Sequence, residues 1–371
     1  MRSMEVAVFR VLPDDKVAEW NKFLTETPHA HPEQDIRFAP VLRAEGNEVA
    51  FVMGWVDNVL RAVALFSLSP HPFLKGYYRE AMTFSGPVCD KPKDLIALVE
   101  GLLAHDTIAG IGRVRVTPYW LEDDATIMQA ALSREGWTVF EDDKMRQTGL
   151  VDLSGTEADI LGRFSKSARA EVRKAERQDL TVDPIREKAD AQEFLASLDR
   201  HRTERGLGLV GEPVLLAALE NVYRTEDLGI ILALRQKGIF IAGLALYRGK
   251  QIAHAALYTT EAGRLRDIQN LRVSPFLWLQ AMKWAKSLGC RQLDVEGYKE
   301  IEDTNDKLYR VYKYKAELAP KLVTRVAGHE KTVNGWINLS GNARDIVKMR
   351  AKSLRKRFRE TLHRVRPKKV V

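Results

Sequence analysis

The chain contains two long apolar runs of the kind that predicts β-strands, and a short polar turn interrupts each of them. The first run covers residues 48–68 and has its turn at Asp57 and Asn58. The second run covers residues 227–248 and has its turn at 236–238, which ends in glycine. Each run therefore predicts a β-hairpin with a buried face.

The residues after each hairpin follow the same order: further extended residues, an apolar helix and a buried-type strand. The two copies lie about 180 residues apart, which indicates a duplicated unit of mixed α/β (α+β) fold class. Two unrelated α/β units would show the same pattern, so duplication is the favoured of two interpretations. The predicted helices are 95–105 and 276–288, and the predicted strands are 113–118, 251–259 and 291–295.

The boundary between the two units is predicted near residue 150. A Ser-Gly-Thr-Glu sequence at 154–157 is a helix start signal, because a hydroxyl side chain followed by acids caps a helix N-terminus. We expect a first domain at 1–150, completed by 319–340, and a second domain at 151–318. The second domain is predicted to continue with an extended segment at 180–185 and a helix at 189–205.

The basic excess of the chain lies in its last 31 residues. Of 58 Lys and Arg and 50 Asp and Glu, residues 341–371 hold twelve bases and two acids, so this segment carries +10 and the rest −2. Its apolar residues recur at spacings of three and four, which predicts a basic amphipathic helix. Such a helix could contact an anionic membrane surface or tRNA through Arg355, Lys356, Arg357 and Arg359, or pack on the protein with its cations in solvent.

The overall composition is that of a globular protein in a reducing compartment. Hydrophobic residues make up 45% and charged residues 29% of the 371 positions. No apolar run reaches the roughly 18 residues of a transmembrane helix, and the N-terminus lacks the apolar core of a secretory signal. Cys89 and Cys290 allow at most one disulfide and are expected to be buried thiols. We therefore expect a cytoplasmic protein.

Common motifs for nucleotide, dinucleotide and metal binding, and for serine nucleophiles, are missing from the sequence. The nearest pair of the eight histidines, His29 and His31, lies in a proline-flanked segment that matches no metal-binding pattern. The sequence thus predicts no metal site.

One candidate binding segment, residues 163–177, carries a row of cations. Lys166, Arg169, Arg173 and Arg177 recur at spacings of three and four, which places them on one face of a predicted helix. This face could bind phosphates or could simply lie in solvent, and charge alone favours the second interpretation.

A second candidate segment, residues 309–315, reads Tyr-Arg-Val-Tyr-Lys-Tyr-Lys. Alternation in its last four residues predicts a strand with Tyr312 and Tyr314 on one face and Lys313 and Lys315 on the other. Aromatic rings beside cations suit contacts with a nucleotide or a sugar, although a strand with a solvated lysine edge would have the same sequence.

Two acids, Asp294 and Glu296, stand at the end of the predicted strand 291–295. Strand ends are where α/β proteins build sites, so the pair is a candidate for chemistry. The alternative is that one of them caps the turn at Gly297.

Several segments, in order, resemble the Fem family of peptidyltransferases. Residues 147–182 are similar to the family's Asp-Leu strand, helix and K-x-R-x-x-I-R-x-A motif, with Arg169 and Arg173 in place and Lys166 displaced by one residue. Residues 308–322 (LYRVYKYKAELAPKL) resemble the family's L-Y-x-F-K-x-x-F-G-x-x-L.

The resemblance continues in the first half of the chain and covers residues 30 to 325 or so. The sequence FSGPVCD at 84–90 is similar to the family's P-R-G-P-V-x-D. Gln34 and Arg43 stand where the family has an early glutamine and a basic residue.

This resemblance implies two tandem Gcn5-related acetyltransferase-like domains with mixed sheets. It implies an enzyme that moves an amino acid from aminoacyl-tRNA to an amine of a peptidoglycan precursor, either lipid-linked or nucleotide-linked. No cofactor is implied, because aminoacyl-tRNA is already an activated ester. The interval 189–219 is too short for the coiled-coil arm that some members carry.

The resemblance also implies roles for single residues. Lys315 stands at the lysine of the family's Phe-Lys pair, which is assigned to the oxyanion of the reaction. Arg43 would contact the precursor diphosphate, and Asp90 matches an acid near the acceptor site. Further candidates for substrate contact are Arg169, Arg173, Tyr312, Lys313 and Tyr314.

Some departures leave the acceptor open: Ser85 replaces the family's arginine, Leu318 is bulky, and residues 206–216 lack the Arg and Tyr with which some members hold their precursor. The main rival function is an acyl-CoA N-acyltransferase, which needs a glycine-rich turn at a helix N-terminus. The equivalent stretch, 273–279, contains no glycine. A third reading is a non-enzymatic binding module.

Overall fold

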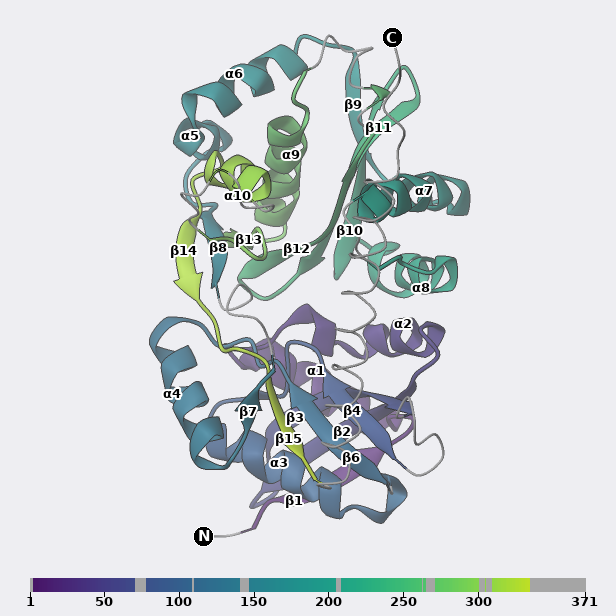
Figure 1. The fold of residues 1–371 in the computed structure, drawn as a ribbon, viewed down its shortest axis with the longest axis vertical. Coiled ribbons are helices and arrows are strands. Elements are labelled where there is room, and N and C mark those ends of the chain that lie inside the picture. Colours follow the sequence, from purple (N-terminus) through teal and green to yellow (C-terminus); the bar gives the residue numbers. More distant parts are fainter. Residues whose placement is uncertain are drawn as a thin grey trace, which may run out of the picture.

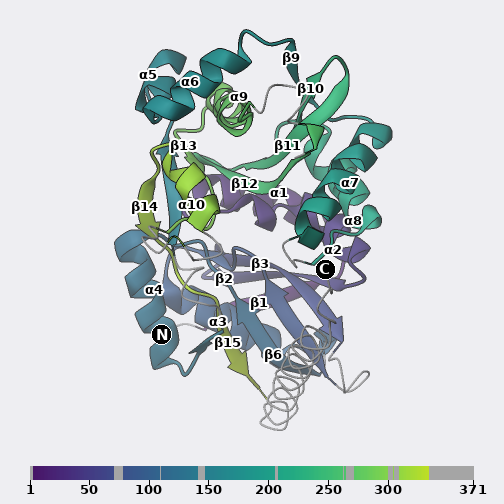
Figure 2. The same cartoon turned by 45° about the horizontal axis from the view of Figure 1, so that its top comes forward.

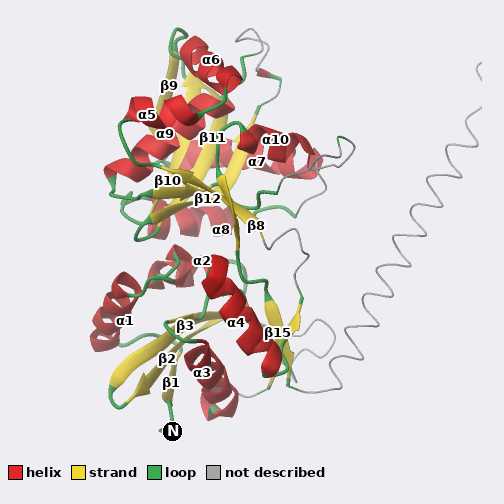
Figure 3. Ribbon diagram, turned by 90° about the vertical axis from the view of Figure 1, so that its left-hand side faces the viewer, coloured by secondary structure: helices red, strands yellow, loops and turns green. Residues whose placement is uncertain are grey.

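A computed structural model describes residues 3–70, 78–108, 110–140, 147–204, 208–261, 263–264, 271–299, 304 and 309–333 of the chain. The described strands form two sheets, and each sheet is the centre of one half of the molecule (Figure 1). The two halves are stacked along the long axis of the molecule (Figure 3). The mixed α/β class and the two-unit architecture predicted from the hydrophobic pattern are therefore confirmed.

The first sheet has the strand order β1-β2-β3-β4-β6-β15-β7, and β5 pairs with β3 at its side. Helices α3 and α4 pack on one face of this sheet, where they bury Leu95, Leu98, Met128 and Leu132. The strands are β1 (Glu5–Phe9), β2 (Glu48–Val56), β3 (Val59–Pro70), β4 (Arg79–Thr83), β5 (Val88–Cys89), β6 (Ile111–Val116), β7 (Thr138–Val139) and β15 (His329–Thr332), and the helices are α1 (Asp14–Glu26), α2 (Ala39–Ala44), α3 (Pro92–Ala104) and α4 (Glu122–Arg134).

The second sheet has the order β14-β8-β13-β12-β11-β10-β9. Helices α5, α6, α9 and α10 cover one face, and α7 and α8 cover the other (Figure 2). The strands are β8 (Gln147–Asp152), β9 (Leu180–Pro184), β10 (Gly229–Gln236), β11 (Ile239–Arg248), β12 (Ile252–Thr260), β13 (Gln292–Asp294) and β14 (Lys321–Thr324), and the helices are α5 (Glu157–Arg163), α6 (Lys166–Ala175), α7 (Lys188–Glu204), α8 (Glu212–Ala218), α9 (Ser274–Ser287) and α10 (Tyr309–Ala316).

A hydrophobic core is shared between the halves. Trp20, Phe38 and Phe51 of the first half belong to the same buried cluster as Phe194 and Tyr223 of the second. Helix α8 lies directly above α2 and packs against it (Figure 3). Burial of apolar surface stabilises this contact and therefore the packing of the two halves against each other.

Both predicted hairpins are present, as β2–β3 and β10–β11. The turn residues Asp57, Asn58, Lys237 and Gly238 all have positive φ, as expected for a two-residue hairpin turn that follows the twist of the strands. The apolar helices α3 and α9, and the strands β6, β12 and β13, lie within a few residues of their predicted positions.

One element prediction is wrong. Residues 309–315 form the helix α10 and not a strand, so Tyr312 and Lys315, three residues apart, lie on the same side of it. Four alternating residues are compatible with a strand or with a helix. The helix allows Tyr312 and Leu318 to pack in the same buried cluster.

Three cations of the predicted row, Lys166, Arg169 and Arg173, do lie on one helix, α6, whereas Arg177 follows its end and the segment 163–177 as a whole is not one helix. Helix α5 ends at Arg163, and α6 begins at Lys166 after Ser165, whose side chain caps it. A capping box between Thr156 and Asp159 begins α5, as the sequence predicted.

The sheets divide the chain in a different way from the predicted boundaries. Strand β8 already begins at Gln147, and β14 pairs with it in the second sheet, although we had grouped residues 319–340 with the first domain. Only β15 returns to the first sheet, where it pairs with β6 and β7. The chain therefore crosses between the halves twice, after residue 140 and after Thr324.

The predicted basic helix at 341–371 lies outside the described residues. Within the described part of the chain, no helix combines the length and the apolar character needed to cross a bilayer. The described residues between 188 and 218 form α7 and α8 and include no long helical arm.

Candidate functional site

A cavity of about 550 Å³ lies between the two halves, and residues of both line it. Its apolar walls include Val41 and Leu42 of α2, Val214 and Leu215 of α8, and residues 255–257 of β12. Its polar lining includes His31, Glu33, Glu45, Ser85, Thr117, Glu296 and Arg325. A largely apolar cavity with a few convergent polar groups is the usual form of a small-molecule or substrate site.

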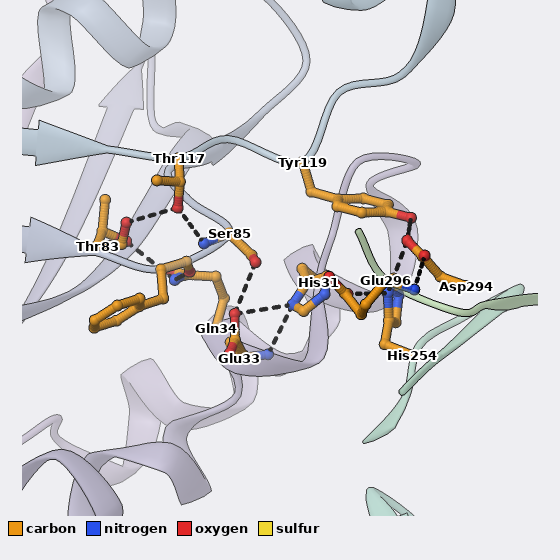
Figure 4. Close-up of polar contacts among 11 residues, drawn as sticks. His31, Glu33, Gln34, Thr83, Ser85, Thr117, Tyr119, His254, Asp294 and Glu296 are labelled. Carbon is orange, nitrogen blue, oxygen red and sulfur yellow. Dashed lines mark hydrogen bonds and ion pairs between the residues drawn. The ribbon is translucent and has the colours of Figure 1, made fainter. Parts of the chain in front are cut away.

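The strand topology explains why polar groups meet here. In the first sheet, β4 and β6 are parallel, and their pairing ends at Thr83 and Val116. In the second sheet, β12 and β13 are parallel, and their pairing ends at His254 and Asp294. The carboxyl ends of two parallel pairs, one from each half, therefore face the same region, as is common for sites of α/β proteins (Figure 4).

Asp294 fixes the turn that follows β13. It is 1% exposed, and its carboxylate accepts hydrogen bonds from the Glu296 amide at 2.7 Å, from the Tyr119 hydroxyl at 2.7 Å and from the Thr148 hydroxyl. Tyr119 belongs to the first half, so this bond joins the halves at the site (Figure 4). Asp294 thus caps the turn at Gly297, which is the alternative that the sequence left open.

The turn itself is strained. Glu296 has φ of 55° and Gly297 has φ of 32°, both in the left-handed region that a glutamate rarely adopts. Such conformations persist where surrounding bonds impose them, and they concentrate at functional sites. Here the turn directs the Glu296 side chain into the cavity and its carbonyl oxygen away from it, toward α10.

Lys315 of α10 binds the back of this turn. Its Nζ donates to the carbonyl oxygens of Glu296 and of Gly297, the latter at 3.2 Å. Burial lowers the pKa of Lys315 to about 8, although the negative charges of Glu296 and Asp294 act in the opposite direction. An ammonium has three N–H donors, and these two carbonyls take two of them. The ammonium of Lys315 is therefore desolvated and lies behind the turn, whose Glu296 side chain lines the cavity.

A cluster of imidazoles and a carboxyl group lies on the other side of the turn. His31, His254 and Glu296 each offer a ligand atom, and these atoms lie within 4.8 Å of one another. The rings of His31 and His254 have centroids 4.1 Å apart, and that of Tyr119 lies 4.9 Å from His254. Burial lowers the pKa of His254 to about 4 and that of His31 well below its ordinary value, so both rings are neutral at pH 7.

Glu296 has an unusual environment for a carboxylate. Its side chain keeps 39% of its surface accessible because it faces the cavity. The surrounding protein nevertheless raises its pKa to about 8, mainly by desolvation and then by the nearby negative charge of Asp294. Glu33 also lines the cavity, and desolvation likewise raises its pKa.

The first half holds its polar groups through Gln34. This residue is fully buried, and its amide donates to the Thr83 hydroxyl at 3.0 Å and to the Phe84 carbonyl at 2.5 Å. Ser85, with φ of 50°, then donates from its hydroxyl to the Glu33 carboxylate at 2.7 Å. Gln34, which the family resemblance indicated, therefore holds the loop after β4 in place through these hydrogen bonds.

None of the three residues predicted to act, Lys315, Arg43 and Asp90, lines the cavity, but Lys315 donates to the carbonyl of Glu296, whose side chain does. Arg43 is exposed on α2, where it donates to the Arg10 carbonyl at 3.0 Å. Asp90 is exposed just before α3. The structure therefore does not bring these two groups together with Lys315.

The remaining candidates lie elsewhere. Arg169 donates to the carbonyls of Gly162 and Phe164 at the end of α5, which is a structural role. Arg173 is exposed on α6, a helix at the end of the second half that is remote from the first half (Figure 1). Tyr312 and Tyr314 pack in the core, and Lys313 lies exposed over the Tyr309 ring. Arg355, Lys356, Arg357 and Arg359 are outside the described residues.

The proximity of His31 and His254 could not be predicted from the sequence. His31 and His254 are 223 positions apart, and no local spacing relates them. The sequence predicted no metal site on that basis, and only the fold brings the two rings together with Glu296. The one usable signal was the Asp294–Glu296 pair at a predicted strand end.

Comparison with known proteins supports the architecture. No family model matches the chain, and no curated protein matches its sequence. The solved structure described as FemX matches with a TM-score of 0.75 at 12% identity over 89% of this chain and 98% of that one. A tandem GNAT protein from the clavulanic acid pathway matches with 0.54 at 11% identity, over 90% and 99% of the two chains. A conserved protein of unknown function from Bacteroides thetaiotaomicron matches with 0.55 at 13% identity, over 89% and 100%.

At these identities the comparisons establish the fold alone. They cover nearly all of each matched structure, so the likeness includes both halves of the chain and their arrangement. The protein therefore has a Fem-like fold of two tandem Gcn5-related acetyltransferase domains.

Proposed function

We propose that the protein is an aminoacyltransferase that moves an amino acid from aminoacyl-tRNA to an amine of a peptidoglycan-precursor peptide. One observation carries the proposal: the desolvated ammonium of Lys315 binds the backbone of the turn whose Glu296 side chain lines a cavity between the two acetyltransferase-like halves. The same lysine is the one that the family motif singles out. The FemX-like fold supports the same reaction class.

The reaction needs only a positioned donor, a positioned acceptor and a cation. The acceptor amine attacks the carbonyl carbon of the aminoacyl ester, a C–N bond forms, and the negative charge collects on the carbonyl oxygen. The C–O bond to the ribose then breaks, and the proton that the amine loses ends on the released ribose hydroxyl. An N–H of Lys315 directed at the oxyanion stabilises this intermediate, and loss of such a donor costs about 3 kcal/mol.

The cavity suits a peptidyl acceptor better than a compact anion. Its apolar walls from α2 and α8 would bury aliphatic parts of a stem peptide, and Arg325 supplies a cation at the polar end. The electrostatic influence of Arg325 reaches Glu33, Glu296 and Tyr119, so its charge is felt across this end of the cavity. A peptide carboxylate is the group that such a cation would hold.

The competing acyl-CoA reaction has poor support at both helix N-termini where a pyrophosphate would bind. At the start of α9, the Glu171 carboxylate accepts from the Arg272 amide at 3.2 Å, and Pro275 removes another donor. At the start of α3, Pro92 again removes a donor and Asp94 occupies the first turn. Acids at these positions repel the anion that a helix N-terminus would otherwise attract.

The proposal places the reaction inside the cell, where aminoacyl-tRNA and the precursor occur together. The basic segment 341–371 is then a candidate contact for tRNA or for the inner face of the membrane that carries a lipid-linked precursor.

A product assay tests the proposed activity. The full-length protein is incubated with a mixture of charged tRNAs and a nucleotide-linked muramyl pentapeptide, and products are read by mass spectrometry. We expect the precursor to gain the mass of one amino acid residue, and the gain to disappear when the tRNAs are deacylated first. A parallel calorimetric titration with acetyl-CoA should show no binding, and tight stoichiometric binding would instead favour the acyl-CoA reaction.

A further inference from the structure

A group of metal-binding side chains lies at the polar end of the cavity. His31 comes from the segment before the short helix Pro32–Gln34, His254 from β12, and Glu296 from the strained turn after β13. One ligand atom of each lies within 4.8 Å of the other two. Figure 4 shows the three side chains converging from both halves of the molecule.

His254 has an unsatisfied atom at this point. The residue is 2% exposed, and its Nδ1 is buried with no hydrogen-bond partner. The nearest acidic oxygens, on Asp294 and Glu296, lie 3.8 and 3.9 Å from it, beyond hydrogen-bonding distance. A buried polar atom without a partner lowers the stability of the fold. A bound ion between this atom and the neighbouring ligand atoms would remove that penalty.

His31 has the supporting contacts of a metal ligand. Its Nδ1 lies 3.3 Å from the Glu33 amide and 3.6 Å from a Glu33 carboxylate oxygen. Nδ1 accepts the bond from this amide, so a metal ion at Nε2 would require the other tautomer, in which Nδ1–H donates to the Glu33 carboxylate instead. Metal-binding histidines commonly use their second nitrogen in this way, which fixes the ring and raises its basicity.

Groups of both kinds surround the cluster. The carboxyl groups of Glu33, Asp294 and Glu296 and the basic side chains of Lys315 and Arg325 influence one another here.

We propose that His31, His254 and Glu296 bind one divalent transition-metal ion of the zinc type at the interface of the two domains, with its open coordination positions toward the cavity. Two imidazoles and one carboxylate are a ligand set that Zn²⁺ and similar ions take up, and three protein ligands leave a position for substrate or water. Tetrahedral bonds of the usual length need ligand atoms about 3.4 Å apart, so atoms that now lie within 4.8 Å of one another must approach by up to about 1.4 Å. The Glu296 side chain faces the cavity and can supply this movement.

Calorimetric titration of the untagged, full-length, chelator-treated protein with Zn²⁺ tests the site. We expect one ion per chain, and no comparable binding of Mg²⁺, which prefers all-oxygen sites. His254→Ala and Glu296→Gln should each weaken Zn²⁺ binding about tenfold or more. His105→Ala, at the C-terminal end of α3, is the matched control and should bind as the wild type does.

Co²⁺ provides a second readout that does not depend on heat. Its visible absorption should report nitrogen ligands in the wild type and change in His254→Ala. If that variant does not fold, Glu296→Gln keeps the test open, because its side chain lies at the cavity surface. Absence of stoichiometric Zn²⁺ binding, or Zn²⁺ binding unchanged in Glu296→Gln, would overturn the proposal. These outcomes do not depend on the transfer reaction.

Discussion

At the scale of single residues, Asp294 organises the site. One buried carboxylate accepts from a tyrosine of the first half, a threonine of β8 and the amide of Glu296. It thereby determines both where the Glu296 side chain points and which carbonyls Lys315 meets. Its position could be predicted from the sequence only as the end of a strand, because Tyr119 and Thr148 are 175 and 146 residues away from it.

We expect Asp294→Asn to destabilise the protein. The new amide nitrogen cannot accept the hydrogen bonds that the carboxylate now accepts from Tyr119, Thr148 and the Glu296 amide. Loss of one hydrogen bond to a buried charged group lowers the free energy of unfolding by about 2 kcal/mol. Urea unfolding followed by circular dichroism measures this. Asp183→Asn, at an exposed position of β9, should unfold as the wild type does. Equal stability of the two variants would contradict the role given to Asp294.

At the scale of elements, close packing depends on glycines that the hydrophobic pattern does not reveal. A Cβ on Gly101 of α3 would lie 2.3 Å from Val6 Cγ2 and 2.6 Å from Val6 Cβ, so the helix approaches β1 too closely for any side chain. A Cβ on Gly162 of α5 would meet nothing within 4 Å.

These two glycines give a matched test of the packing. Gly101→Ala should lower the free energy of unfolding by about 1–3 kcal/mol, because overpacking forces the helix and strand apart. Gly162→Ala should leave it unchanged or raise it by up to about 1 kcal/mol, since alanine is the better helix former. Chemical denaturation of both variants decides, and a neutral Gly101→Ala would show that α3 does not pack on β1 as described.

The elements also show what the sequence can and cannot predict. The hairpins β2–β3 and β10–β11 and the helices α3 and α9 were predictable because long apolar runs have an unambiguous period. Helix α10 was not, because four alternating residues fit a strand equally well. The cavity residues His31 and His254 were beyond prediction, because the fold alone joins segments that are distant in sequence.

At the scale of the whole molecule, the excess positive charge and the candidate site lie in different parts of the chain. The site lies between two halves of a body with net charge −2, whereas residues 341–371 carry +10. If the proposed function holds, the transfer reaction and the electrostatic attraction of a polyanion belong to different parts of the chain.

Deleting residues 341–371 should therefore weaken binding to tRNA or to anionic lipid vesicles, and the loss should shrink as salt is raised. Filter binding with tRNA and sedimentation with vesicles of anionic and of neutral lipids separate the two partners. The wild type should bind at least one of them at low salt. If the variant without residues 341–371 binds tRNA and anionic vesicles as the wild type does, the segment does not contact either partner.

The most direct test of the central claim compares two lysines of α10. The ammonium of Lys315 donates to the carbonyls of the turn that carries Glu296, whereas Lys313 is exposed on the other side of the same helix. Single-turnover transfer from charged tRNA to the muramyl pentapeptide is measured for Lys315→Met and Lys313→Met, with urea unfolding to confirm that both fold. The account predicts a loss of about 100-fold or more in Lys315→Met and less than about twofold in Lys313→Met. An undiminished rate in a folded Lys315→Met protein would contradict it.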